Sequence, residues 1–222
     1  MPARSCVKQN LIIISAGKLG RETYGWAAAA MAQGAPWRIK GFLDARANIL
    51  EGMDYEQGVI GDVANYQIQP DDVFIGAIGE PKDKVKYYTP ILERGGKFIN
   101  LIHPTACIGK NVRLGTGVIL APFTCTTSDL QVGNFVTVLP YSNLTHDNVI
   151  GDWCQISSHC GVNGNVTLGE GVFLGGHTCV VPQVSIGAWT FVCAGSVVVR
   201  SLPAGVKVFG NPARPVASVI QK

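Results

Sequence analysis

The sequence predicts two unlike parts, an α/β domain over residues 1–103 and an all-β domain of stacked short strands over residues 104–222. In the first part, apolar strand-like runs alternate with helical segments. In the second part, an aliphatic side chain returns at every sixth residue. A period of six fits neither an α-helix nor a plain alternating strand, so it indicates a repeat protein.

The first part is expected to form a small parallel sheet covered by helices. In chain order we expect a strand at 11–15, a helix at 21–33, a strand ending at 41–44, a strand at 73–79, a helix from about residue 81, and a strand at 98–102. Alternating strands and helices of this kind build a Rossmann-like domain.

The loop after the first strand has glycines in the order of a nucleotide-binding loop. Residues 15–20 read Ser-Ala-Gly-Lys-Leu-Gly, the dinucleotide fingerprint with serine in place of its first glycine. Backbone N–H groups of such a loop can bind phosphate, and Asp44, at the end of the second strand, can bind a ribose or a base. Three interpretations stay open: binding of a substrate's nucleotide, binding of a whole nicotinamide dinucleotide, or glycines that serve only turning and packing.

The six-residue repeat runs from Ile108 to Val198 without a change of phase. Fifteen of its sixteen aliphatic positions are Ile, Leu or Val, and the exception is Thr126. Glycine often follows the aliphatic residue, and a small or β-branched residue usually lies four places after it. Each hexad is therefore expected to be a short strand and a sharp turn, and three hexads make one triangular coil. Burial of each aliphatic side chain contributes ~1.5–3 kcal/mol.

Composition excludes several functional classes. With 47% hydrophobic and 15% charged residues the chain fits a soluble globular protein, and its apolar run at 11–14 is too short for a membrane span. No signal-peptide pattern surrounds that run, so a cytoplasmic protein is expected. The net charge of +3 comes without a dense basic block, which argues against nucleic acid as a partner. Seven cysteines without CxxC spacing are expected to be reduced and structural.

Over nearly its whole length the chain resembles a bacterial family of hexapeptide-repeat sugar acyltransferases. The resemblance rests on SAGKLGRE and GFLDAR in the first part, NLIHPTA at the junction, and GNPARPV after the repeats. This family includes N-acetyltransferases of nucleotide-linked 4-amino sugars and sialic-acid O-acetyltransferases. The resemblance implies a left-handed parallel β-helix, a homotrimer, and acetyl-CoA bound in active sites between neighbouring β-helices, with no metal.

The same resemblance implies roles for individual residues. The catalytic histidine–acid pair falls on His146 and Asp147, within LTHDNVIGDWCQIS. Contacts to the nucleotide sugar fall on Gly17, Lys18, Leu19, Asp44 and Gly79, and contacts to acetyl-CoA fall on Gln155, Gly176 and Ala194. The implied reaction acetylates an amino group of a nucleotide-linked amino sugar in surface-glycan or glycoprotein biosynthesis. A sugar hydroxyl as acceptor, or a non-catalytic hexapeptide scaffold, are the alternatives.

The repeat itself supports part of the acetyl-CoA assignment. Ser158, Gly176 and Ala194 are separated by 18 residues, one full coil, so they are expected to stack at one corner of the triangle. Small side chains there either leave a groove for the pantetheine arm or merely allow a tight turn.

Three histidines have expected positions in the coils. His146 follows an aliphatic residue by two places, so we expect it in a turn, with Gly164 one coil above it. His159 and His177 are also one coil apart and are expected to stack on an outer surface. Such a pair favours packing at a subunit interface, with a metal site as the alternative.

Overall fold

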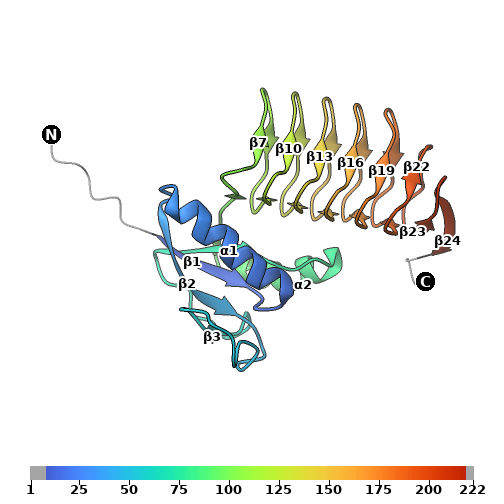
Figure 1. Ribbon diagram of the computed structural model, residues 1–222. Coiled ribbons are helices and arrows are strands. Elements are labelled where there is room, and N and C mark those ends of the chain that lie inside the picture. Colours follow the sequence, from blue (N-terminus) through green and yellow to red (C-terminus); the bar gives the residue numbers. More distant parts are fainter. Residues whose placement is uncertain (1–8, 219–222) are drawn as a thin grey trace.

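The computed structural model describes residues 9–218 (Figure 1). A small α/β domain lies beside the first coils of a long β-solenoid, and the coils follow one another along a single axis. Both parts expected from the sequence are present. No helix within the described residues is long and apolar enough to cross a membrane.

The α/β domain is a parallel sheet with a helix on each face. Its elements are β1 (Gln9–Ile14), α1 (Lys18–Ala32), β2 (Trp37–Leu43), β3 (Val59–Gly61), β4 (Asp72–Gly76), α2 (Pro81–Glu93) and β5 (Lys97–Phe98). The strand order is β3-β2-β1-β4-β5. Successive side chains of a strand face opposite sides of the sheet. Accordingly Leu11 and Ile13 pack with α1, whereas Ile12 and Ile14 pack with α2.

The strand expected at 98–102 is divided between two sheets. β5 pairs with β4, whereas β6 (Leu101–Ile102) pairs with β9 (Ile119–Leu120) of the solenoid. Between them, the side-chain amide of Asn100 donates to the carbonyl oxygen of Gly115, 2.8 Å away in the next coil. The expectation of one continuous strand was wrong because an apolar run does not show where the chain leaves one sheet for another.

The solenoid has three faces, each a sheet of short strands. Face 1 has the order β24-β23-β21-β18-β15-β12-β9-β6, face 2 has β22-β19-β16-β13-β10-β7, and face 3 has β20-β17-β14-β11-β8. Their remaining bounds are β7 (Cys107–Ile108), β8 (Arg113–Leu114), β10 (Cys125–Thr126), β11 (Gln131–Val132), β12 (Thr137–Val138), β13 (Asn143–Leu144), β14 (Val149–Ile150), β15 (Gln155–Ile156), β16 (Gly161–Val162), β17 (Thr167–Leu168), β18 (Phe173–Leu174), β19 (Cys179–Val180), β20 (Ser185–Ile186), β21 (Phe191–Val192), β22 (Val197–Val198), β23 (Val206–Phe209) and β24 (Arg214–Ser218). All pairings are parallel except that of β23 with β24.

The predicted period of six is confirmed strand by strand. Each repeat position from Ile108 to Val198 is the second residue of a two-residue strand. These side chains form one continuous core, and only Ile108, in an end coil, is largely exposed. Thr126 is fully buried, and its hydroxyl donates to the carbonyl oxygen of Cys107 at 3.3 Å. A hydroxyl is therefore accommodated in the apolar column by bonding to the coil beside it.

Each corner of the triangle contains one residue per coil with a positive φ. We call the corner between faces 1 and 2 the first corner, that between faces 2 and 3 the second, and that between faces 3 and 1 the third. The residues at the first corner are Phe123, Tyr141, His159, His177 and Gly195; at the second, Asn111, Asp129, Asp147, Asn165 and Gln183; at the third, Gly117, Phe135, Trp153, Gly171 and Trp189. Only the second corner is built entirely from polar side chains.

A buried lysine of α2 joins the two parts of the protein. The ammonium of Lys84 donates to the carbonyl oxygens of Phe135 (3.1 Å) and Cys154 (2.9 Å) and to the hydroxyl of Thr137 (3.0 Å). Tyr88, one turn further along α2, packs its ring against that of Phe135. Burial lowers the pKa of Lys84 to about 7. The solenoid thus supplies three acceptors, but no carboxylate, to a fully buried amine.

Replacing Lys84 with methionine should remove a pH dependence of stability. The pKa of this amine is about 7 in the folded protein and 10.5, its ordinary value, in the unfolded chain. Between these values the unfolded chain binds more protons, so the contribution of Lys84 to the unfolding free energy rises with pH, by up to about 1.4 kcal/mol per pH unit. Urea unfolding across this range should show the wild type gaining stability relative to Lys84→Met.

The exposed lysine of the same helix, Lys86, provides the control. Lys86→Met should differ from the wild type by an amount that stays constant with pH. A constant difference for Lys84→Met as well would contradict the burial argument.

Candidate active site

His146 and Asp147 form a pair in a turn at the second corner. Nδ1 of His146 lies 2.8 Å from Oδ2 of Asp147, and the two side chains are 58% and 52% exposed. Asp147 has a φ of 60°, and its N–H donates to the carbonyl oxygen of Ser128, one coil away, at 3.2 Å. The turn expected for His146 is present. Backbone bonds to the adjacent coil, rather than side-chain packing, hold the pair in place.

The imidazole of His146 lies over Gly164 in the next coil. A Cβ atom at Gly164 would come within 2.4 Å of Cε1 and 2.6 Å of Nε2 of this ring. The φ of Gly164 is not in the positive range that favours glycine. Glycine is therefore required here by the space that the ring occupies. The sequence placed Gly164 above His146, but nothing in the sequence signalled that it makes room for the ring.

The cysteines nearest in sequence to this pair are not available as nucleophiles. Cys154 and Cys160 are buried in the solenoid interior, where their thiols donate to the carbonyl oxygens of Gly169 and Gly175, each at 3.2 Å. Burial raises the pKa of Cys154 to about 12 and that of Cys160 to about 11. Neither thiol is a thiolate at neutral pH. Every cysteine in the described chain is free, and Cys6 lies outside it.

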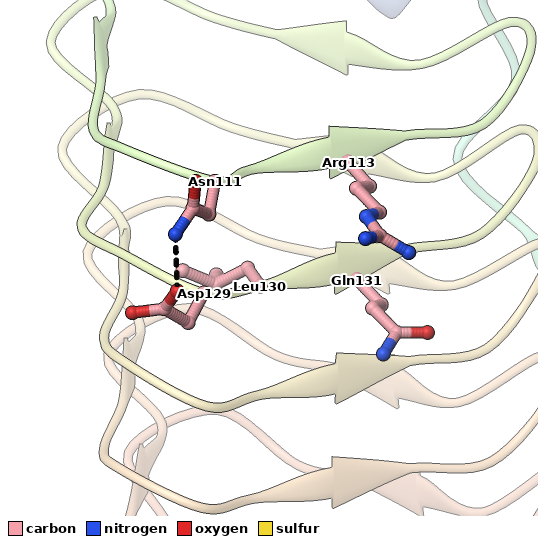
Figure 2. Close-up of a pocket in the computed structure, with 5 residues that line it drawn as sticks. All are labelled: Asn111, Arg113, Asp129, Leu130 and Gln131. Atoms are coloured by element: carbon pink, nitrogen blue, oxygen red, sulfur yellow. Dashed lines mark hydrogen bonds between the residues drawn. The ribbon is translucent and has the colours of Figure 1, made fainter.

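A hollow of about 390 Å³ (Figure 2) lies at the second corner, lined by residues one and two coils nearer the N-terminus than the His146–Asp147 turn. Its lining residues are Asn111, Arg113, Asp129, Leu130 and Gln131. The Asn111 amide donates to Asp129 at 2.8 Å. Asp129 precedes Asp147 by one coil, and Gln131 pairs with Val149 just after the turn. The hollow therefore offers a guanidinium, amides and a carboxylate next to the histidine pair.

The residues predicted to bind a nucleotide sugar gather at one edge of the parallel sheet. Gly17, Lys18 and Leu19 lie where β1 leads into α1, Asp44 follows β2, and Gly79 lies between β4 and α2. Because these strands are parallel, their carboxyl ends meet at the same edge. The Lys18 side chain is exposed, and a Cβ at Gly79 would meet nothing within 4 Å.

Packing accounts for one of the two loop glycines. A Cβ at Gly20 would lie 2.0 Å from the carbonyl oxygen of Ser15, so the close approach of α1 to β1 requires glycine there. At Gly17 a Cβ would meet only the Ser15 hydroxyl at 3.2 Å and the Arg46 guanidinium at 3.8 Å. The surroundings of Gly17 thus constrain it much less.

Asp44 does not present a free carboxylate. Its Oδ2 accepts from the N–H of Ala16 at 2.9 Å, and its Oδ1 accepts from the N–H of Arg46 at 3.0 Å. Two nitrogens of the Arg46 guanidinium, Nε and Nη2, each donate to one of these oxygens at 2.9 Å. Burial alone would raise the pKa of Asp44, but the hydrogen bonds and charge of Arg46 hold it below its usual range. Sequence reasoning missed Arg46, whose only signal was its place two residues after the acid.

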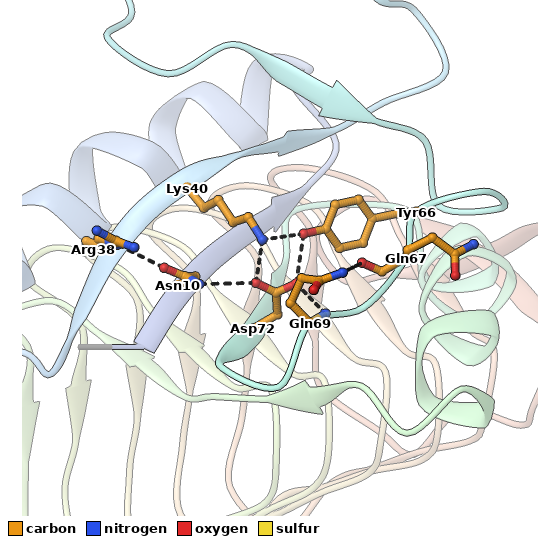
Figure 3. A network of polar contacts seen from close by, with 7 residues as sticks. All are labelled: Asn10, Arg38, Lys40, Tyr66, Gln67, Gln69 and Asp72. Carbon is orange, nitrogen blue, oxygen red and sulfur yellow. Dashed lines mark hydrogen bonds and ion pairs between the residues drawn. The ribbon is translucent and has the colours of Figure 1, made fainter. Parts of the chain in front are cut away.

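A second buried carboxylate lies at the opposite edge of the sheet (Figure 3). Asp72, at the start of β4, accepts from Lys40 (2.7 Å), the Tyr66 hydroxyl (2.7 Å) and the N–H of Gln69 (2.8 Å). Burial alone would raise the pKa of Asp72, but these bonds and the charge of Lys40 hold it below its usual range. Since Lys40 lies in β2, the network ties β2 to β4 on either side of β1. Its groups bond one another, as expected of a structural network.

The residues predicted to bind acetyl-CoA occupy a corner and a face of the solenoid. Gly176 and Ala194 occupy the first corner one coil apart, and a Cβ at Gly176 would meet only the Ser158 carbonyl oxygen, at 3.4 Å. Gln155 lies instead on face 1, where it is 2% exposed and its Oε1 has no partner among the described residues. His146 lies at the second corner. A single chain therefore does not join the predicted base to the predicted acetyl-CoA groove.

His159 and His177 stack as the repeat predicts. Their ring centroids are 4.7 Å apart and their planes differ by 2°. Tyr141 and Phe123 extend this stack along the exposed first corner, with centroid spacings of 5.1 and 5.0 Å. Between residues 9 and 218 no group of three or more His, Cys, Asp or Glu side chains is placed to hold a metal ion.

A solenoid of hexads with a histidine–acid pair at an open corner is the arrangement that the resemblance to hexapeptide-repeat acyltransferases implies. No family model and no curated protein matches the chain. Among solved structures, the acetyltransferase domain of PglB from Neisseria gonorrhoeae FA1090 is 26% identical with a TM-score of 0.85, covering 94% of this chain and 100% of that one. PerB from Caulobacter crescentus, in complex with CoA and GDP-perosamine, is 28% identical with a TM-score of 0.84, covering 94% and 97%. WeeI from Acinetobacter baumannii AYE is 25% identical with a TM-score of 0.82, covering 93% and 99%. These structures confirm the resemblance to sugar acyltransferases.

Replacing Gly164 with alanine should impair catalysis without unfolding the protein. The new methyl group would occupy the space of the His146 ring, so the ring must turn away from its position beside Asp147. If His146 is the catalytic base that the resemblance implies, kcat should fall by ~10-fold or more, since general-base catalysis depends on the placement of the base. Steady-state kinetics and a melting curve measure the two effects.

The matched control is Gly161→Ala in the same coil, where a Cβ would meet only the Asn143 side-chain oxygen at an ordinary 3.6 Å. Its kcat should equal that of the wild type. If Gly164→Ala and Gly161→Ala were equally active, catalysis would not depend on the position of the His146 ring beside Asp147.

Proposed function

We propose that this protein transfers the acetyl group of acetyl-CoA to the amino group of a nucleotide-linked amino sugar. The observation that carries the proposal is the His146–Asp147 pair on an open corner of the hexad solenoid. The overall similarity supports the substrates, since the PglB domain is known in complex with acetyl coenzyme A, and PerB in complex with CoA and GDP-perosamine.

His146 acts in this proposal as the general base. With the Nδ1 proton donated to Asp147, Nε2 keeps its lone pair free for the proton of the attacking amine. The amine nitrogen forms a bond to the thioester carbonyl carbon, and its proton passes to Nε2. The carbon–sulfur bond then breaks, and the CoA sulfur leaves with that proton. Asp147 fixes the ring and stabilises the imidazolium formed during the transfer.

Transfer is direct, without an acetylated enzyme. A covalent route needs a nucleophile beside the base. Cys154 and Cys160 point into the core instead, with protonated thiols. The hollow beside the second corner is suited to the acceptor, because amides, a carboxylate and a guanidinium bind sugar hydroxyls.

The handedness of the solenoid and the type of the α/β domain are part of the same proposal. We infer a Rossmann-like domain and a left-handed solenoid for the two expected parts, 1–103 and 104–222, of which residues 1–8 and 219–222 lie outside the described residues. The strand order β3-β2-β1-β4-β5 and the overall match to the acetyltransferase structures support both assignments. In this scheme Gly17, Lys18, Leu19, Asp44 and Gly79 belong to the nucleotide-sugar site.

A complete site requires two chains, and we propose a homotrimer. His146 lies at the second corner, whereas Gly176 and Ala194 lie at the first. A neighbouring chain can bring its first corner against the second corner of another. The exposed stack at the first corner offers apolar surface for that contact. The acetyl-CoA substrate and the free cysteines support a cytoplasmic location.

The first test replaces His146 with alanine. We expect kcat to fall by ~10²–10⁴-fold, with little change in the KM of either substrate. The fold should persist because the side chain lies in an exposed turn. Calorimetric titration with acetyl-CoA separates this proposal from a non-catalytic scaffold, which would not bind it. A fully active His146→Ala protein would overturn the mechanism.

The second test examines the shared site. Gly176→Leu should obstruct the acetyl-CoA groove without disturbing the core, because no side chain lies within 4 Å of a Cβ there. Subunits with this change and subunits with His146→Ala are each expected to be inactive alone. Refolding them together should restore activity, since some interfaces then carry neither lesion. Mixed trimers, verified by mass spectrometry, that stay inactive would refute the shared site.

A further inference from the structure

We propose that Arg46, rather than Asp44, binds the nucleotide at this site, and that its ligand is the diphosphate. This rests on the proposed function, in which the α/β domain holds a nucleotide sugar. Asp44 is then a positioning residue, which holds the guanidinium beside the loop at Gly17.

The carboxylate of Asp44 has little capacity left for a ligand. Its two oxygens accept four hydrogen bonds, from the N–H of Ala16, the N–H of Arg46, and the Nε and Nη2 groups of Arg46. A carboxylate has about four lone-pair positions, so these bonds saturate it. The side chain is also only 6% exposed. A ribose hydroxyl could bind Asp44 only by displacing one of these donors.

The guanidinium of Arg46 has the opposite properties. Its side chain is 66% exposed, and of its five N–H donors two point at Asp44, so three remain for a ligand. A planar guanidinium with several free donors matches the geometry of phosphate oxygens. Because the Asp44 carboxylate holds the Nε–Nη2 edge of the guanidinium by two hydrogen bonds, little side-chain entropy is lost when Arg46 binds an anion.

The position of Arg46 favours the diphosphate over the base. Its Nη2 lies 3.8 Å from the point where a Cβ of Gly17 would be, so the guanidinium flanks the start of α1. No acidic residue occupies the first turn of α1, and no side chain caps it. Lys18 and Arg21 belong to that same turn. Asp44 offsets one charge, and the Arg21 guanidinium bonds the Met53 sulfur 2.9 Å away. The free donors of Arg46, the exposed Lys18 and the uncapped start of α1 still suit a doubly charged group more than a neutral base or ribose.

The experiment compares Arg46→Gln, Arg46→Lys and Asp44→Asn in the full chain. Each is titrated by calorimetry with UDP, GDP and dTDP, with the corresponding monophosphates and nucleosides, and with acetyl-CoA. For the diphosphate that the wild type binds best, we expect Arg46→Gln to lose ~10-fold or more in affinity and Arg46→Lys to lose less. The loss should shrink for the monophosphate and vanish for the nucleoside. In kinetics, the KM of the sugar should rise while kcat and acetyl-CoA binding stay unchanged.

Asp44→Asn tests the positioning role. Asp44→Asn alone should weaken diphosphate binding. The double variant with Arg46→Gln should bind no more weakly than Arg46→Gln alone, because both changes remove the contact between Arg46 and the diphosphate. Arg38→Gln is the matched control. Arg38 is an exposed arginine of β2 near the opposite edge of the sheet, where its Nε donates to Asn10 at 2.9 Å (Figure 3). This change removes one positive charge and should leave nucleotide binding unaltered.

Several outcomes overturn the proposal. If Arg46→Gln binds the diphosphate as well as the wild type while Asp44→Asn does not, Asp44 is the ligand. If Arg46→Gln weakens the nucleoside and the diphosphate equally, the contact is to the base or the ribose. If the wild type binds no nucleotide yet acetylates an unlinked amino sugar through His146, the nucleotide part of the proposed function fails and the acetyl transfer stands.

Discussion

The solenoid depends on the backbone hydrogen bonds between coils, which from Leu101 to Val198 place each strand residue opposite the residue 18 positions further along. The register is the same in successive coils, from Cys125 opposite Asn143 to Cys179 opposite Val197. Because the register does not shift, residues one coil apart form straight columns. The neighbours above and below a side chain are therefore the residues at the same position of the adjacent coils. The space above His146 is therefore set by the single residue Gly164. The same backbone bonds also align the aliphatic side chains of the core and the stacked rings of His159 and His177 on the surface.

The α/β domain is held to this column by α2. This helix follows Gly79, which belongs to the proposed nucleotide site, and carries Lys84 on its buried side little more than one turn later. Three acceptors of the solenoid fix the amine of Lys84, and Tyr88 packs on Phe135 beside it. The proposed nucleotide site and the coils are thereby connected through buried contacts, although the sequence separates them into two parts.

The sequence was sufficient for features that repeat or that depend on near neighbours. The period of six located each strand, and the two-place offset from Leu144 located His146 in its turn. Features set by distant contacts had no local signal. Lys84 looks like an ordinary helical lysine, because its acceptors lie 51 to 70 residues away. Asp44 looked like a free acid because sequence does not reveal whether a nearby guanidinium turns towards it. Gln155 fits the repeat equally well whether or not another domain covers its face.

The difference between the three corners bears on how such proteins change during evolution. Rings and glycines occupy the positive-φ positions at the first and third corners, whereas Asn, Asp and Gln occupy those at the second. At the first and second corners these side chains project from exposed turns, while the aliphatic column inside is supplied by other residues of each hexad. At these two corners mutation can therefore exchange the chemistry of the turn without altering the core, whereas Phe135 and Trp153 at the third corner pack against Tyr88 of α2. An ancestral solenoid of this kind could acquire, lose or relocate a catalytic histidine while its stability stayed nearly constant.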